Sequence, residues 1–147
     1  MLSGGAGSSG SWDGTGMLSL SAELRQTLLA HARAGLPDEA CGLLLGGGNR
    51  VADVLWLANR AATPRTHYAL DPLEYMRAEQ HADRQELAVI GVWHSHPEAA
   101  AEPSATDARD AWPGWFYLIV GRPGDAVPEV RAWRLTAGRF TEVRTTG

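Results

Sequence analysis

The sequence predicts an α/β domain in which helices cover both faces of a central mixed sheet, a three-layer α/β/α arrangement. Two apolar runs, residues 87–93 and 115–120, have the length and the branched or aromatic content of buried strands. Two other stretches, residues 21–35 and 71–86, have the signals of helices. Strands and helices that alternate along one chain are typical of this fold class.

Both predicted helices have defined starts. In the first, apolar residues recur on one face, Ser21 can cap the N-terminus, and Gly35 can end the helix. The second opens with Asp-Pro-Leu-Glu at residues 71–74. This order places a capping carboxylate, a proline at the first helical position and a glutamate three residues after the cap.

The other predicted elements are short. Three consecutive glycines after residue 45 indicate a hairpin, and branched residues near the C-terminus indicate antiparallel partners. These elements are strands at 41–45, 51–57, 67–70, 129–135 and 139–144, and a helix at 104–111.

The composition is that of an ordinary globular protein. Hydrophobic residues make up 44% of the 147 residues, and the net charge is −4. This charge offers no basic patch, so we expect neither nucleic acid nor membrane as a partner. No apolar run approaches the roughly 20 residues needed to cross a bilayer, and the N-terminus lacks a secretory signal, which predicts a cytoplasmic protein.

The chain divides into a tail and one domain. Residues 1–16 are mostly Gly and Ser and are expected to be a flexible tail. Residues 17–147 contain no repeat or second linker and are long enough for one hydrophobic core. The only cysteine, Cys41, excludes an intramolecular disulfide and a multi-cysteine zinc site.

Two histidines follow the apolar run at 87–93. Side chains at i and i+2 of a strand share a face, so His94 and His96 can bind one metal ion. Pro97 ends the strand at once, which places the pair at a strand end, where α/β sheets commonly build their sites. A bare His-x-His motif also fits a solvated pair or one satisfied within the core.

A hydroxyl and a carboxylate follow downstream, at Ser104 and Asp107. A catalytic zinc ion takes three imidazole or carboxylate ligands and leaves its fourth position to water, so Asp107 can complete a set with the two histidines. The same Ser-x-x-Asp spacing also fits a capping box, in which both side chains bond backbone N–H groups. The sequence leaves both interpretations open.

Taken together, these residues resemble the signature of the JAMM (MPN+) metalloprotease family. The matching pattern is His-x-His-Pro at 94–97, the seven residues from Pro97 to Pro103, and Ser-x-x-Asp at 104–107. Upstream, residues 39–46 resemble the family segment that carries a glutamate. The resemblance extends over about residues 18–144 and implies a cytidine-deaminase-like MPN domain.

The resemblance also implies a role for each site residue. His94, His96 and Asp107 would hold Zn²⁺. Glu39 would act as the general base and pass a proton to the leaving amine or thiol. Ser104 would donate a hydrogen bond to the oxyanion of the tetrahedral intermediate.

The chain is most similar to the compact prokaryotic branch of this family. That similarity implies a zinc hydrolase that cleaves an amide or isopeptide bond at the C-terminus of a ubiquitin-like or sulfur-carrier protein. The alternatives are a peptidase for other small amides and a non-catalytic interaction scaffold. A homodimer is compatible with the sequence.

Several other residues have weaker interpretations. Cys41 could line the site or fill the core, and Asp110 could orient a metal ligand or face water. The tryptophans at 93, 112 and 115 could flank a cleft, although aromatic residues near buried strands usually belong to the core. His31 and His67 are expected to be structural or exposed.

Overall fold

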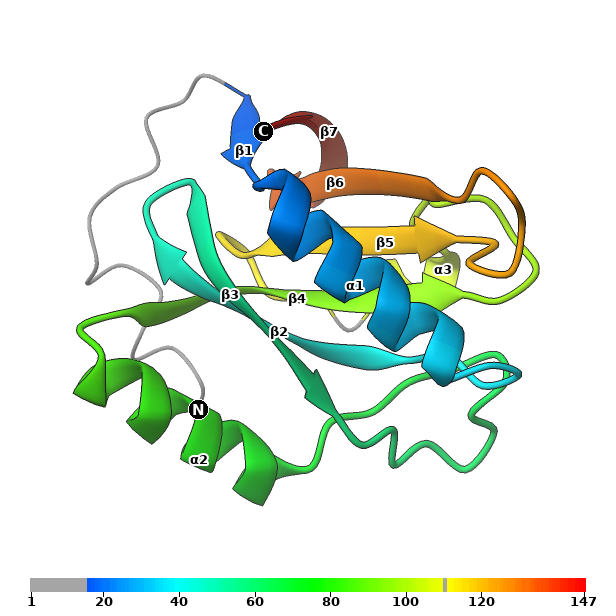
Figure 1. Ribbon diagram of the computed structural model, residues 1–147, viewed down its shortest axis with the longest axis horizontal. Coiled ribbons are helices and arrows are strands. Elements are labelled where there is room, and N and C mark those ends of the chain that lie inside the picture. The colour runs from blue at the N-terminus through cyan, green and yellow to red at the C-terminus, as the bar shows by residue number, and fades with distance from the viewer. Residues whose placement is uncertain (1–15, 110) are drawn as a thin grey trace.

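The computed structural model describes residues 16–109 and 111–147 (Figure 1). Residues 1–15 of the predicted tail and Asp110 therefore lie outside the described residues. No helix in the described ranges is long and apolar enough to cross a membrane. The elements are β1 (Met17–Ser19), α1 (Ala22–Ala34), β2 (Cys41–Gly47), β3 (Arg50–Leu57), α2 (Pro72–Arg84), β4 (Ala88–His96), α3 (Ala105–Arg109), β5 (Phe116–Gly121), β6 (Glu129–Thr136) and β7 (Arg139–Thr146).

The seven strands form one closed sheet in the order β1-β3-β2-β4-β5-β6-β7. The β4–β5 pair is parallel, and the β2–β3, β2–β4, β5–β6 and β6–β7 pairs are antiparallel. Strand β1 closes the sheet because it pairs in parallel with both β3 and β7. The predicted mixed sheet with helices is therefore confirmed.

The prediction of a three-layer, cytidine-deaminase-like arrangement is not confirmed in this form, because the sheet closes at β1. This three-residue strand was not predicted, since Met17–Ser19 is too short to show a periodic pattern. A second difference concerns residues 67–70, which form a loop instead of the predicted strand. There, the Arg60 backbone N–H donates to the Ala69 carbonyl, and residues 67–70 do not pair with a strand of the sheet.

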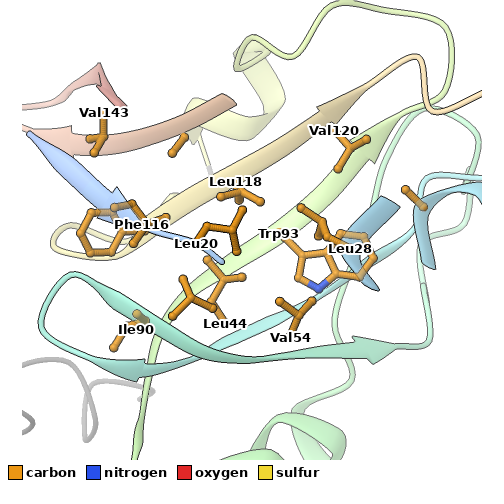
Figure 2. Close-up of a cluster of buried hydrophobic side chains, with 14 of the residues drawn as sticks. Leu20, Leu28, Leu44, Val54, Ile90, Trp93, Phe116, Leu118, Val120 and Val143 are labelled. Carbon is orange, nitrogen blue, oxygen red and sulfur yellow. The ribbon is translucent and has the colours of Figure 1, made fainter. Parts of the chain in front are cut away.

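The two long helices pack against different sets of strand side chains. Leu28 and Ala32 of α1 belong to a buried cluster that also contains Leu44, Trp93 and Leu118 (Figure 2). A second buried cluster contains Tyr75, Ala78 and Ala82 of α2 together with Leu43, Leu45, Val89 and Val92. Neighbouring residues of β2 alternate between the clusters, as expected for a strand buried on both faces.

An irregularity in β4 decides which cluster the two histidines face. In the β2–β4 ladder Leu44 pairs with Gly91 but Leu45 pairs with Val89, so Ile90 is an extra residue on β4. Such a bulge shifts the alternation of side chains beyond it. Val92 consequently faces the α2 cluster, and His94 and His96, at successive i+2 positions, point to that same side.

The predicted helix caps are confirmed. The Ser21 hydroxyl accepts a hydrogen bond from the Leu24 backbone N–H at 3.1 Å. The Asp71 carboxylate accepts one from the Leu73 backbone N–H at 2.9 Å, and Pro72 begins α2. Glu74 does not complete a capping box, because its carboxylate bonds the Ala58 backbone N–H at 3.2 Å and so ties α2 to the end of β3.

Candidate metal centre

Three side chains from β4 and α3 converge at the C-terminal end of β4. The Nε2 atoms of His94 and His96 lie 3.2 Å apart, and each lies 3.2 Å from Oδ2 of Asp107. All three ligand atoms lie within 4.8 Å of one another, and no other histidine, cysteine or acidic residue of the described chain belongs to this group. Two imidazoles and one carboxylate arranged in this way could hold a metal ion.

A backbone carbonyl orients the His96 ring. Nδ1 of His96 lies 2.8 Å from the carbonyl oxygen of Ala100, so Nδ1 carries a proton and Nε2 is the ring nitrogen that faces the centre. Gly121, which pairs with His96 across β4 and β5, allows the loop to approach, because a Cβ there would lie 2.6 Å from the Ala101 nitrogen.

Asp107 is held by the start of α3. The Ser104 backbone N–H donates to Oδ2 of Asp107 at 2.9 Å, and the Asp107 backbone N–H donates to the Ser104 hydroxyl oxygen at 3.0 Å. This reciprocal pair is the capping box that the spacing allowed. The Ser104 hydroxyl is exposed and its proton remains available to donate, so capping does not exclude a second role.

The three side chains have different ionisation properties. Complete burial lowers the pKa of His94. Burial acts in the same direction on His96, but bonds to Asp107 and to the Ala100 carbonyl outweigh it and raise the pKa of His96. Burial also disfavours the Asp107 anion, yet the bonds from His94 and His96 hold the pKa of Asp107 well below its ordinary value. Asp107 is therefore an anion at neutral pH.

Glu39 lies beside this centre but is not one of the three converging residues. Its side chain is buried, and burial, opposed by His96 and reinforced by the Asp107 anion, raises the pKa of Glu39 to about 7. Two hydrogen bonds fix its neighbour Ala40 to β4: Ala40 N–H to Ser95 Oγ at 2.8 Å, and Ser95 N–H to the Ala40 carbonyl at 2.9 Å. The middle residue of the His-Ser-His motif thus holds the Glu39 segment in place.

A second side chain that was not predicted also holds this segment. The Asn59 amide nitrogen donates to the carbonyls of Glu39 and His67, both at 2.9 Å. The Asn59 amide oxygen accepts from the backbone N–H groups of Ala61 and Ala69. Asn59 therefore ties the loop between β3 and α2 to the Glu39 backbone. An asparagine that follows a predicted strand was the only sequence signal for this role.

None of the described residues with weaker interpretations belongs to the group of three ligand residues. Cys41 is buried, and burial raises the pKa of its thiol to about 12. His31 is half-buried and packs against Trp56 and Trp93, and His67 is exposed. An apolar cavity adjoins the centre beside Asp107 and includes two of the predicted cleft tryptophans. Its lining includes Tyr68, Tyr75, Val92, Asp107, Trp112, Trp115 and Tyr117.

The comparison with protein families accounts for this arrangement. Residues 21–136 match the family model described as prokaryotic homologs of the JAB domain. The chain belongs to this family. The predicted membership in the prokaryotic branch of the JAMM/MPN+ family is therefore confirmed.

Relatives of this chain match it over most of its length. It is 40% identical over 131 residues to a desampylase from Haloferax volcanii, covering 84% of this chain and 88% of the relative. It is 33% identical over 129 residues to a CysO-cysteine peptidase from Mycobacterium tuberculosis, covering 86% and 88%. The solution structure of protein DSY2949 from Desulfitobacterium hafniense has a TM-score of 0.80 at 32% identity, covering 88% and 92%.

Proposed function

We propose that this chain is a zinc-dependent hydrolase that cleaves an amide or isopeptide bond at the C-terminus of a ubiquitin-like or sulfur-carrier protein. The observation that carries the proposal is the convergence of His94, His96 and Asp107 within 4.8 Å. The buried carboxylate of Glu39 beside this set supplies a base that is not itself a ligand. We assign the activity to one domain that spans residues 17–147.

The donor set fits zinc. Two imidazole nitrogens and one carboxylate oxygen are a common ligand set of catalytic zinc, which keeps its fourth position for water. The hydrogen bond from His96 Nδ1 to Ala100 leaves Nε2 as the ligating atom. In the metal-free protein, hydrogen bonds from both histidines lower the pKa of Asp107, so its carboxylate is already ionised near neutral pH. Zinc bound there would lower the pKa of its water to about 7.

The chain's own residues would manage the proton and the developing charge. Glu39, with a pKa of about 7, is suited to accept a proton from the attacking water and return it to the leaving nitrogen. The exposed Ser104 hydroxyl can donate to the oxyanion that forms on the scissile carbonyl while its oxygen still caps α3. The bonds of Ala40 to Ser95 and of Asn59 to Glu39 keep the base from drifting.

The substrate class follows from the relatives. A desampylase and a CysO-cysteine peptidase, each covering more than four fifths of this chain, indicate a small protein conjugate as substrate. A third relative, from Thermus thermophilus, is a probable TtuB-protein conjugate cleaving protease, 34% identical over 110 residues. All three activities break a bond to a small carrier protein. A cytoplasmic location and a homodimer stay predictions.

One experiment tests both metal and substrate. Protein purified without chelator is analysed for its elements, then incubated with candidate carrier proteins that bear a C-terminal cysteine or lysine adduct. We expect about one zinc per chain and, by mass spectrometry, loss of the adduct mass from the carrier. If the protein neither contains nor takes up a transition metal, the catalytic proposal is contradicted and the alternative function as a non-catalytic interaction scaffold is supported. Metal-bound protein that cleaves only small amides supports the alternative peptidase.

A further inference from the structure

The two histidines of the centre are supported differently. His96 donates from Nδ1 to the Ala100 carbonyl. His94 is completely buried, yet its Nδ1 has no hydrogen-bond partner among the described residues. A metal-ligating histidine almost always anchors its second ring nitrogen in a hydrogen bond, which fixes the ring. Another contact must therefore hold the His94 ring.

That contact is the ring of Tyr68. The Tyr68 and His94 ring centroids lie 4.4 Å apart with an interplanar angle of 21°, which is a stacked arrangement. The only other described ring contact of His94 is with His96, at 5.0 Å and 59°. Tyr68 covers one face of the imidazole. It therefore limits the side-chain rotation of His94 that would move Nε2 away from the centre. Stacked rings of this kind stabilise a structure beyond the effect of burying their apolar surface.

Tyr68 belongs to a loop, so something must hold it against the histidine. The Asn59 side chain bonds the residues on both sides of Tyr68: its amide nitrogen donates to the His67 carbonyl at 2.9 Å, and its amide oxygen accepts from the Ala69 N–H at 3.1 Å. The same amide nitrogen donates to the Glu39 carbonyl. One side chain thus fixes the loop with Tyr68 and the segment with Glu39 relative to each other.

We propose that Tyr68 is a positioning residue, seated by Asn59, whose ring holds His94 in its ligating orientation in place of the hydrogen bond that His94 lacks. This inference rests on the proposed metal centre. In this proposal the aromatic ring, and not the phenol hydroxyl, positions His94. A phenylalanine at this position should therefore serve as well as tyrosine, whereas an aliphatic side chain should not.

The test compares metal affinity in three variants of the full chain. Tyr68→Phe keeps the ring, Tyr68→Leu removes it, and Phe140→Leu is the control. Phe140 is also partly buried on the α2 side and makes an edge-on contact with Tyr117 at 5.4 Å, so its loss removes a comparable contact away from His94. Zinc dissociation constants are measured by chelator competition, the visible spectrum of the cobalt(II)-loaded protein reports coordination geometry, and thermal unfolding reports stability.

We expect Tyr68→Leu to weaken zinc binding about 10- to 100-fold and to change the cobalt spectrum. Tyr68→Phe and Phe140→Leu should stay within about twofold of the wild type, even if Phe140→Leu melts as early as Tyr68→Leu. Equal affinity and an unchanged spectrum in Tyr68→Leu overturn the inference and leave the proposed function intact. Weakening of the same size in Phe140→Leu also overturns it, because the effect is then general destabilisation. A wild-type protein that binds neither metal overturns both.

Discussion

Two carboxylates lie at the same centre in contrasting surroundings. Asp107 accepts a hydrogen bond from the Ser104 backbone and lies 3.2 Å from both imidazoles, and these contacts hold its pKa well below the ordinary value. The Glu39 side chain has no hydrogen-bond partner among the described residues, and burial raises its pKa to about 7. Both residues are largely shielded from solvent: the Asp107 side chain is 8% exposed and Glu39 is 6% exposed.

The contrast indicates that hydrogen-bond donors, and not burial, separate the pKa values of the two carboxylates. A carboxylate surrounded by donors stays charged and can ligate a cation, whereas one that is only buried exchanges a proton near neutral pH. Single substitutions at this centre remove one part of this difference at a time.

The largest effect is expected from Asp107→Asn. The substitution keeps the shape of the side chain but removes the anion that faces both histidines, so we expect zinc content near zero and no measurable turnover. Elemental analysis after purification without chelator, combined with the adduct assay, checks this. Full zinc occupancy in the variant would show that Asp107 is not a ligand.

The matched change at the other carboxylate, Glu39→Gln, should keep the metal. We expect normal zinc content and a turnover reduced by about 10² to 10⁴, the range typical of loss of a general base. The same two measurements apply. Wild-type turnover would mean that another group is the base, and loss of zinc would make Glu39 a ligand, erasing the difference between the two carboxylates.

A smaller effect is expected from Ser104→Ala, because the backbone N–H of residue 104 still reaches Asp107. If the hydroxyl donates to the oxyanion, turnover falls by about 10² to 10³ while zinc affinity barely changes. If it serves only as the cap, stability falls by about 0.5–2 kcal/mol and turnover per bound zinc stays normal. We expect the first outcome, with stability, zinc content and turnover measured on one preparation.

The smallest effect concerns the stability of the metal-free protein. The pKa of Glu39 rises from 4.5 to about 7 on folding. Between these pH values the folded chain keeps a proton on Glu39 that the unfolded chain has released, so the free energy of unfolding decreases as the pH rises, until the folded carboxyl also ionises near pH 7. Asp107 has the opposite sign: its lowered pKa stabilises the fold above pH 3.8, and this contribution is lost in acid. At pH 8, Glu39→Gln should therefore be more stable than the wild type, and Asp107→Asn less stable.

For Glu39→Gln we expect a gain on the order of 1 kcal/mol, allowing for screening by water, and no gain near pH 4. Urea unfolding of chelator-treated protein at both pH values measures it. An Asp107→Asn protein that is more stable than the wild type at pH 8 would contradict the opposite signs of the two groups.

Much of the centre could be predicted because its parts are local. The i, i+2 spacing of His94 and His96 puts both rings on one side of any strand, and the Ser104–Asp107 spacing fits the first turn of a helix. The missed supports, Ser95, Asn59 and Tyr68, act across long sequence distances, and no local pattern indicates such partners. Ser95, for example, bonds Ala40, 55 residues away.

The sequence by itself determined the helix caps, the strand that delivers the two histidines, and the residue types of the centre. These features depend on the period of the backbone and on neighbours within about one turn. Only the tertiary structure decided that β1 closes the sheet and that the extra residue Ile90 turns the histidines toward the α2 side. It also brings Glu39 and Tyr68 to the centre. These features depend on pairing and packing between distant segments, whose free energy is gained only when the whole fold brings them together.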